Sequence, residues 1–296
     1  MKLRVVHETR YDYEPPVESA RHIVHLRPRE TPWQRLLHHE LVIAPVVAQQ
    51  SERRDVWGNT RMSFDLHTTH RELRVVADSV VLTGAPPPAS GGPAWEQVSE
   101  GFRFRAGGQW HPAAEFVFPS EYVPRHEDFL GYARDCFKPG APMLDVAMAL
   151  MRRIHRDFTY ASASTTVDTP AVEALARRRG VCQDFAHVMI ACLRARSLAA
   201  RYVSGYLLTA VPGGAPRLVG SDASHAWVSV WSPDEDGAAG TGQWHDFDPT
   251  NDRQPGEDYV TLAWGRDFGD VSPMRGLLQG GGDHLLEVGV TVDAVD

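Results

Sequence analysis

Short runs in which apolar and polar residues alternate fill the first 83 residues of the chain. They read KLRVVHETRYDY, RHIVHLRP, LLHHELVIAP, RMSFDLHTT and ELRVVADSVVLT, and proline, glycine and asparagine turn signals separate them. A period of two indicates strands with one buried face. Regularly spaced short strands predict a small antiparallel β-domain, and they are typical of a sandwich.

The stretch GAPPPASGGPAW, residues 84–95, interrupts this alternation. Its prolines and glycines cannot form a helix and offer few donors to a sheet, which is typical of a linker. We therefore place a domain boundary near residue 90, with a β-domain over residues 1–90 and a second domain over residues 91–296. A long loop that joins two packed halves would have the same composition.

The hydrophobic period lengthens to that of a helix after residue 121. MLDVAMALMRRIHRDFTY, TPAVEALARRRG and CQDFAHVMIACLRARS each carry their apolar residues at helical spacing. The period then returns to two in ARYVSGYLLTA, SHAWVSVW, QWHDFDPT and HLLEVGVTV. Helices followed by antiparallel strands predict an α+β fold for the second domain.

Length, composition and net charge indicate a globular protein and exclude several other classes. The 296 residues, of which 43% are hydrophobic and 23% charged, are typical of a globular protein of two domains. The N-terminus has no apolar leader and no run approaches the ~18 apolar residues of a membrane span, so we expect a cytoplasmic protein without a membrane partner. The net charge of −8, with acids and bases interspersed, argues against a nucleic-acid partner.

Three cysteines, Cys136, Cys182 and Cys192, are too few and odd in number for a disulfide framework, which fits a reducing compartment. Free cysteines are usually buried apolar residues, and we interpret Cys136 and Cys192 in this way. Cys182 differs because it stands at the start of an apolar helix. We expect Gly180 to take a positive φ that lets the chain turn sharply into this helix. The N–H groups and dipole of a helix N-terminus favour an anion there, such as a thiolate.

A thiol nucleophile needs a histidine that exchanges its proton and a third group that orients the imidazole. The strands SHAWVSVW and QWHDFDPT, joined by a turn-rich segment, predict a hairpin. A register that pairs His225 with Asp248 sets Trp227 opposite Asp246, and a slip of two residues still leaves Asp248 diagonal to His225. We therefore expect Asp248 to be the orienting group, with Asp246 as the second choice. The alternative is that Asp248 only begins a turn before a proline.

The motifs RRGVCQDFAH, DASHAWVSVW and DFDPTN, in this order, resemble those of the bacterial transglutaminase-like superfamily. The segment LRVVHETRYDYEPPVESARHIVHLRPR is similar to the N-terminal β-domain of such proteins. The resemblance implies a papain-like domain in which Cys182 is the nucleophile, His225 the base and acid, and Asp248 the orienting group. It also implies attack on an amide carbonyl of a peptide or protein substrate and a thioester acyl-enzyme, with no cofactor.

Relatives of this kind divide between cysteine proteases or amidases and true transglutaminases that crosslink glutamine to lysine. The triad activates the nucleophile in both, so it does not decide between them. We favour a cysteine protease or amidase that acts on peptides. A protein-glutamine gamma-glutamyltransferase is the alternative.

Further residues are candidates for supporting roles. The backbone N–H of Cys182 is suited to an oxyanion hole, and Tyr160 is a candidate for its side-chain donor, although a core aromatic would look the same. Gln183 and Asp184 follow the nucleophile, and we interpret them as scaffolding. Asp222 could lie at the rim of the cleft or simply in a turn.

Two other classes of protein compete with a cysteine enzyme. A metal site of Cys182, His187 and Cys192 would place its ligands about 140° apart around the helix, and no CxxC or HExxH motif supports it, so we expect no metal. A noncatalytic papain-like binding module usually lacks part of the triad, whereas all three residues are present here.

Overall fold

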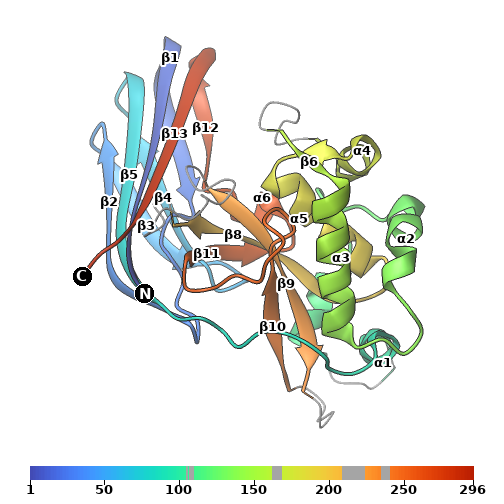
Figure 1. Cartoon of the computed structure of the whole chain (residues 1–296). Helices are drawn as coiled ribbons and strands as arrows, with labels where there is room; N and C mark the ends of the chain where they lie inside the picture. Colours follow the sequence, from blue (N-terminus) through green and yellow to red (C-terminus); the bar gives the residue numbers. More distant parts are fainter. Residues whose placement is uncertain (105, 107–109, 162–168, 209–223, 235–240) are drawn as a thin grey trace.

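The computed structural model describes residues 1–104, 106, 110–161, 169–208, 224–234 and 241–296 (Figure 1). A long, curled antiparallel sheet stands beside a domain in which helices pack on a second sheet (Figure 1). No helix within these described ranges is both long and apolar enough to cross a membrane.

The first sheet is built around one long strand, β1. Its strands are β1 (Lys2–Val24), β2 (Gln34–Ala44), β3 (Gln49–Arg54), β4 (Thr60–Leu66), β5 (His70–Thr83), β12 (Met274–Gly280) and β13 (Asp283–Ala294). The first half of β1 pairs with β5 on one side and β13 on the other, and its second half pairs with β4 and β12. The expected antiparallel β-domain is therefore present. Its strands form a single hydrogen-bonded sheet and not the two layers of a sandwich. The reason is that β4 continues β5 along one side of β1, and β12 continues β13 along the other side.

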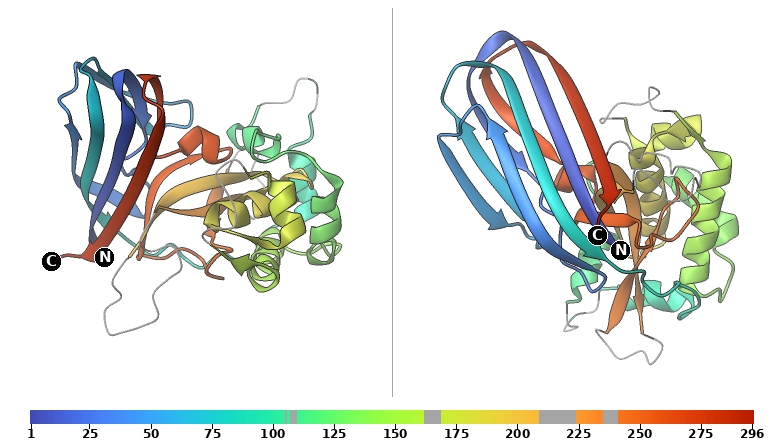
Figure 2. Two further views of the ribbon diagram at one scale, coloured as in Figure 1. Left: turned by 90° about the horizontal axis from the view of Figure 1, so that it is seen from above. Right: turned by 60° about the vertical axis from the view of Figure 1, so that its left-hand side comes forward.

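The C-terminal strands belong to this first sheet. The assignment of HLLEVGVTV to the strands of the second domain is wrong, because β13 pairs with β1 from Leu3↔Ala294 to Glu14↔Asp283. Pairing depends on which strand offers a complementary edge, and chain order does not reveal this. The two ends of the chain consequently lie side by side (Figure 2), and the Val295 N–H donates to the Lys2 carbonyl. The boundary near residue 90 stays a prediction.

The second domain surrounds one buried helix, α5. Its helices are α1 (Trp95–Gly101), α2 (Glu127–Ala133), α3 (Met143–Asp157), α4 (Ala171–Arg177), α5 (Cys182–Arg194) and α6 (Phe268–Val271), with 3₁₀ turns η1 (Pro112–Val117) and η2 (Arg134–Cys136). Its strands are β8 (Ala200–Leu207), β9 (His225–Pro233), β10 (Gly242–Phe247) and β11 (Tyr259–Gly265), in the order β10-β9-β8-β11, and a short parallel pair, β6 (Thr159–Tyr160) and β7 (Arg179–Gly180). Every residue of α5 is buried, because other helices cover one side of it and the sheet covers the other.

The two faces of the four-stranded sheet have different neighbours. On β9, Ala226 and Val228 belong to the core around α5, whereas Trp227 points to the opposite face. The first sheet packs against one end of β8 and β11, through an apolar cluster that includes Val5 of β1 and the paired residues Tyr206 and Val260. The alternation of β9 thus places Ala226 and Val228 beside the helices and Trp227 on the face away from them.

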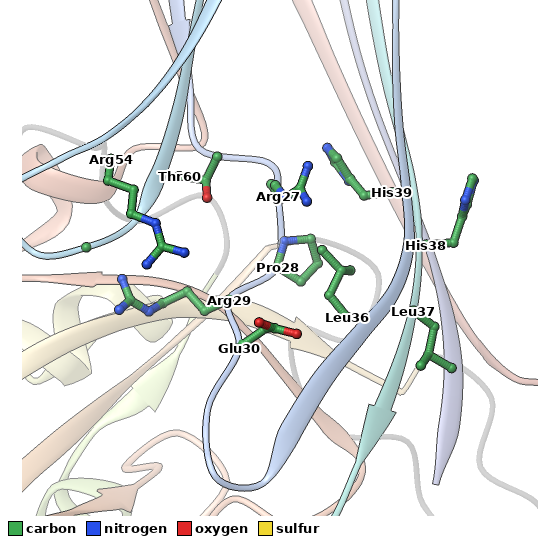
Figure 3. Close-up of a pocket in the computed structure, with 11 residues that line it drawn as sticks. Arg27, Pro28, Arg29, Glu30, Leu36, Leu37, His38, His39, Arg54 and Thr60 are labelled. Atoms are coloured by element: carbon green, nitrogen blue, oxygen red, sulfur yellow. The ribbon is translucent and has the colours of Figure 1, made fainter.

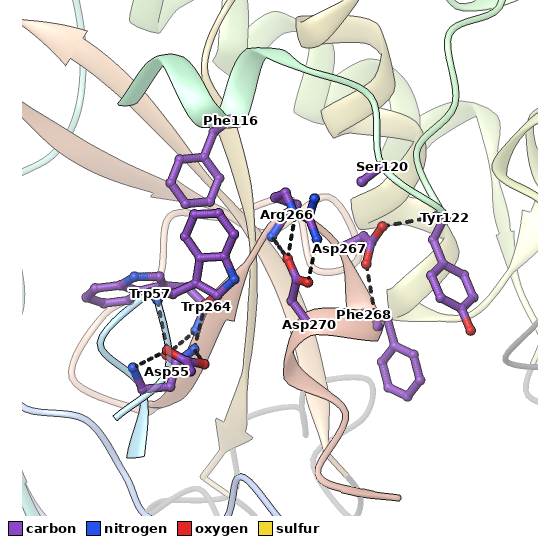
Figure 4. Close-up of polar contacts among 12 residues, drawn as sticks. Asp55, Trp57, Phe116, Ser120, Tyr122, Trp264, Arg266, Asp267, Phe268 and Asp270 are labelled. Atoms are coloured by element: carbon purple, nitrogen blue, oxygen red, sulfur yellow. Dashed lines mark hydrogen bonds and ion pairs between the residues drawn. The ribbon is translucent and has the colours of Figure 1, made fainter. Parts of the chain in front are cut away.

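Two side-chain amides of the first domain cover the edge of the second sheet. The Gln34 amide donates to the Thr261 carbonyl and accepts from the Thr261 N–H, each at 2.7 Å. Asn59 makes the same two contacts with Trp264, at 2.9 and 3.0 Å, and Asp55 in turn accepts from the Asn59 amide (Figure 4). These amides take the place of a neighbouring strand, because they bond to backbone N–H and C=O groups of the edge strand β11 that would otherwise be unpaired. They also fix one domain against the other.

Candidate active site

Cys182 is the first residue of α5 and its side chain is 9% exposed. Asp184, in the first turn of the helix, accepts a hydrogen bond of 2.8 Å from the Val181 N–H. A carboxylate near a helix N-terminus complements the exposed N–H groups there. Asp184 thus helps to define where the helix starts.

Gly180 has a different role from the one expected. The positive φ in this region belongs to Arg178, at 52°, which ends α4 in the left-handed conformation. Gly180 lies instead in β7, paired with Tyr160. A Cβ on Gly180 would come within 2.4 Å of Asp184 Oδ2, so the glycine is needed because the capping carboxylate packs directly against the backbone. The expected positive φ was wrong, since the turn is made two residues earlier.

His225 and Asp248 form a fully buried pair. His225 Nε2 lies 2.8 Å from Asp248 Oδ2, and both side chains have no exposed surface. The hairpin pairs Phe247 with Val228, so the strands are slipped by two residues from the register that sets Asp248 opposite His225. Asp248 is therefore diagonal to His225, as the alternative register allowed. In this register Gly242 pairs with Pro233, and a Cβ on Gly242 would meet the Ser232 carbonyl oxygen at 2.5 Å.

The Asp248 carboxylate is held by several donors. Its Oδ2 also accepts 2.8 Å hydrogen bonds from the Asn251 side chain and the Tyr259 hydroxyl, and its Oδ1 accepts from the Thr250 N–H at 2.8 Å. Sequence reasoning missed these three donors. Asn251 and Thr250 lie within the DFDPTN motif, which was a usable signal, whereas Tyr259 reaches the site from β11 and gave none.

The environment favours charge on both members of the pair. Burial alone raises the pKa of Asp248, but the His225 charge and the hydrogen bonds from His225, Asn251 and Tyr259 outweigh it and lower that pKa below its ordinary value. Burial likewise lowers the pKa of His225, but Asp248 and the nearby Cys182 sulfur outweigh it and raise that pKa above its ordinary value. His225 Nδ1 is buried and makes no hydrogen bond to any group in the described part of the chain. Asp248 thus holds the imidazole through Nε2, and the raised pKa of His225 favours the charged ring.

Asp246 does not contact His225. Its Oδ2 accepts a 3.0 Å hydrogen bond from Trp227 Nε1, and its backbone pairs with Ser229. Trp227 stacks on the His225 ring, with centroids 6.2 Å apart. The second-choice orienting residue therefore supports a neighbour of the imidazole and leaves the imidazole to Asp248.

The remaining candidates lie in different surroundings. Tyr160, in β6, is 36% exposed, with its ring against Phe185. Gln183 is buried in the first turn of α5. Asp222 lies outside the described residues. Among the residues that the structure describes, no group of three histidine, cysteine or acidic side chains is placed to hold a metal ion, and His187 Nε2 accepts from the Phe268 N–H.

Two family models match separate parts of the chain. Residues 3–82 match the family model of the bacterial transglutaminase-like N-terminal region, and residues 131–249 match that of the transglutaminase-like superfamily. An uncharacterized protein of Mycobacterium tuberculosis is 40% identical over 299 residues, which cover 99% of this chain and 92% of the relative. One from Mycobacterium leprae is 32% identical over 295 residues, 98% of each chain.

Two comparisons concern proteins with a more specific description. A solved structure described as a "Putative Cysteine Protease" from Cytophaga hutchinsonii has a TM-score of 0.71 and 22% identity, covering 99% of this chain and 98% of that one. At this identity the likeness shows a common fold. A protein-glutamine gamma-glutamyltransferase of Pseudomonas aeruginosa is 32% identical over 112 residues, which are 37% of this chain and 16% of that protein.

Proposed function

Since the chain belongs to the transglutaminase-like superfamily, we propose that it is a cysteine enzyme that cleaves or transfers amide-linked acyl groups of peptides, and foremost a cysteine protease or amidase. The observation that carries this proposal is the buried 2.8 Å pair of His225 and Asp248 beside a cysteine at a helix N-terminus. The three cysteines, free in the structure, are compatible with the cytoplasmic location that we also propose.

In the proposed mechanism, the Cys182 thiolate attacks the carbonyl carbon of an amide. The imidazolium of His225 stands next to the sulfur and favours the thiolate form, and Asp248 keeps the ring in one orientation. The oxyanion that forms is stabilised by the backbone N–H of Cys182 and, we propose, by the Tyr160 hydroxyl. His225 Nδ1 then gives its proton to the leaving amine as the C–N bond breaks, which leaves an acyl thioester and a neutral imidazole.

The second half of the reaction decides the type of enzyme. A water molecule or a primary amine attacks the thioester, His225 Nδ1 accepts its proton, and the thiolate leaves. Water yields a free acid, and an amine yields a new amide. The partial similarity to a protein-glutamine gamma-glutamyltransferase favours keeping acyl transfer as the second candidate.

The experiment is a competition between the two acceptors. Purified protein is incubated with a peptide library that contains glutamine, in the presence and absence of a labelled primary amine, and mass spectrometry counts hydrolysed and labelled products. We expect hydrolysis to dominate and Cys182→Ala to abolish both products. Cys136→Ala, at a half-buried cysteine outside the site, is the matched control and should retain activity.

The outcomes separate the candidates. A majority of amine adducts would make the chain a transglutaminase. Turnover that persists in Cys182→Ala would refute the thiol mechanism. No turnover by the wild type, together with equal iodoacetamide labelling of Cys182 and Cys136 at pH 6, would favour a noncatalytic module instead.

A further inference from the structure

Arg201 is a buried arginine whose Nε has no hydrogen-bond partner among the described residues. It lies on β8, its side chain points away from α5, and it is 8% exposed. Its guanidinium stacks on the rings of Trp264 and Trp244, at 3.7 and 4.2 Å from their centroids. The nearby Asp246 attracts it through its charge, yet these two described side chains form no ion pair within 4.0 Å.

Such an arrangement is costly in a protein interior. Burial lowers the pKa of Arg201, and the attraction of Asp246 only partly opposes this effect. A buried cation normally has a hydrogen-bonded anion beside it, because desolvation without such a partner costs several kcal/mol. Perturbed charges of this kind cluster at sites that bind a ligand. Packing alone therefore does not explain why a charged arginine is buried at this position.

Arg201 lines a cavity between the two domains. The cavity has a volume of about 490 Å³, within the range of small-molecule sites. Its other walls include the rings of Trp33, Trp227, Trp244, Tyr259 and Trp264. Asp246 lines it as well, with Oδ2 already bonded to Trp227. The cavity thus combines an apolar, aromatic interior with one cationic donor and one anionic acceptor.

The walls of the cavity are held rigidly. Trp264 lies between Arg201 and Arg29, whose guanidinium carbon is 3.5 Å from the same ring centroid; two guanidinium groups this close to one ring centre must take opposite faces. Arg29 donates to the Trp57 carbonyl and to Asn59, and Gln34 bonds to Thr261 on the same strand as Trp264. The site is therefore preformed, and binding of a ligand would not carry the free-energy cost of ordering its side chains.

We propose that this cavity binds the carboxyl-terminal residue of a peptide that ends in an apolar side chain. The planar guanidinium of Arg201 has the geometry to receive a carboxylate on two N–H groups. The amide N–H of the same residue can donate to Asp246. The side chain then occupies the space between the tryptophan rings, where burial of apolar surface adds to binding.

This site is separate from the proposed nucleophile but shares walls with the proposed catalytic pair. Trp227 stacks on His225, and the Tyr259 hydroxyl bonds to Asp248. Cys182 lies at the start of the helix that packs on the other face of the sheet. The inference goes beyond the catalytic proposal, and binding can be measured whether or not the protein turns over a substrate.

The test compares two ligands that differ only in charge. N-acetyl-L-phenylalanine carries the carboxylate and the amide N–H, whereas N-acetyl-L-phenylalaninamide lacks the carboxylate. Binding to the full chain is followed by tryptophan fluorescence and by calorimetry. We expect the acid to bind at least about tenfold more tightly than the amide, a ratio typical of a charge-assisted pair.

Three variants locate the site. Arg201→Met should weaken binding of the acid about tenfold or more and leave that of the amide unchanged, and Arg201→Lys, which keeps the charge but not the planar fork, should fall between. Arg54→Met is the control, because Arg54 points into a neighbouring hollow next to Arg29 (Figure 3) and does not line this cavity. Thermal unfolding verifies that each variant folds.

The proposal fails if acid and amide bind equally, if Arg201→Met binds the acid as the wild type does, or if the wild type shows no saturable binding below about 10 mM acid. If Arg201→Met does not fold, the comparison of acid and amide on the wild type and on Arg201→Lys decides.

Discussion

The Tyr259 hydroxyl donates to Asp248 Oδ2, the same oxygen that accepts the His225 hydrogen bond, and both contacts are 2.8 Å long. Tyr259 opens β11, the strand at the edge of the second sheet, which Gln34 and Asn59 attach to the first domain. The orientation of the candidate base is thus tied, through one phenol, to a strand that the other domain holds in place.

Tyr259→Phe should alter the candidate base while the fold remains. The ring stays packed on Trp227, but Asp248 loses one donor, so its negative charge is less satisfied and attracts the His225 imidazolium more strongly. We expect the pKa of His225 to rise further, and the free energy of unfolding to fall by about 1 kcal/mol. The measurements are the pH dependence of Cys182 alkylation by iodoacetamide and a urea titration.

The matched control for this variant is Tyr206→Phe. Tyr206 is also a buried tyrosine with a bonded hydroxyl, in this case to His7 at 2.9 Å, and it does not contact the candidate triad. It should lose similar stability and keep the wild-type alkylation profile. Identical profiles for wild type and Tyr259→Phe would show that this phenol is only structural.

Asp248→Asn tests the link between the carboxylate and the imidazole. Loss of the negative charge removes the main effect that raises the pKa of His225, so the imidazole becomes neutral at a lower pH and no longer favours a thiolate. We expect Cys182 alkylation at pH 6 to slow by about tenfold or more, since one pKa unit is tenfold in the population of the charged form.

Asp270→Asn is the corresponding control, because Asp270 is another partly buried carboxylate paired with a cation, Arg266 at 2.9 Å. Figure 4 shows the pair of Asp270 and Arg266. The Asp270→Asn variant should alkylate like the wild type. An Asp248→Asn protein that labels as fast as this control would exclude an imidazolium effect on the cysteine.

Features that depend on residues close together in the chain could be predicted from the sequence, whereas features that depend on distant segments could not. The start of α5 at Cys182 follows from the apolar helical pattern, although the turn before it is made at Arg178 and not at Gly180, and proximity of His225 to Asp248 follows from a hairpin. Both depend on residues close together in the chain. The exact register did not follow, because a slip of two residues keeps every side chain on the same face of the sheet and so leaves the hydrophobic pattern unchanged.

The features that were missed are those decided by packing between distant segments. β13 pairs with β1 across nearly the whole chain, and Tyr259 reaches Asp248 only because β11 lies beside β8. Alternating apolar positions specify that a strand has a buried face, but they do not specify its neighbour. For the same reason no pattern indicated that Arg201 would be buried between two tryptophans.

Gly180→Ala should disturb the start of α5. The added Cβ would lie 2.4 Å from Asp184 Oδ2, so the carboxylate must move away from the Val181 N–H that it now caps. We expect a loss of about 1–3 kcal/mol in the free energy of unfolding and slower alkylation of Cys182, whose position depends on this turn. Calorimetry and mass spectrometry provide the two measurements.

Gly131→Ala is the control for this change, because Gly131 lies within helix α2 and a Cβ there would meet nothing within 4 Å. Alanine should be tolerated and should stabilise the helix by up to about 1 kcal/mol. Equal effects of the two substitutions would contradict the role assigned to the contact between Gly180 and Asp184.

Buried neutral histidines should make the fold sensitive to mild acid. His7 is 1% exposed and lies between the Tyr206 hydroxyl and Thr9, and burial lowers its pKa to about 4. In the unfolded chain the same group has a pKa near 6.5, at about the ordinary value. Between these two values the unfolded chain binds a proton that the folded chain does not, so stability falls as the pH drops from about 6.5 to 4, by about 3 kcal/mol for this residue.

His7→Gln removes the titrating group and can keep both hydrogen bonds. Between pH 6.5 and 4, its free energy of unfolding should therefore fall by about 3 kcal/mol less than that of the wild type. Tyr206→Phe removes a hydrogen bond and leaves the imidazole in place, so it should be less stable at every pH with the acid-dependent slope retained. Urea titrations at a series of pH values measure both. A wild-type slope in His7→Gln would assign the acid sensitivity to other buried groups, of which His22, whose pKa burial also lowers to about 4, is the next to replace.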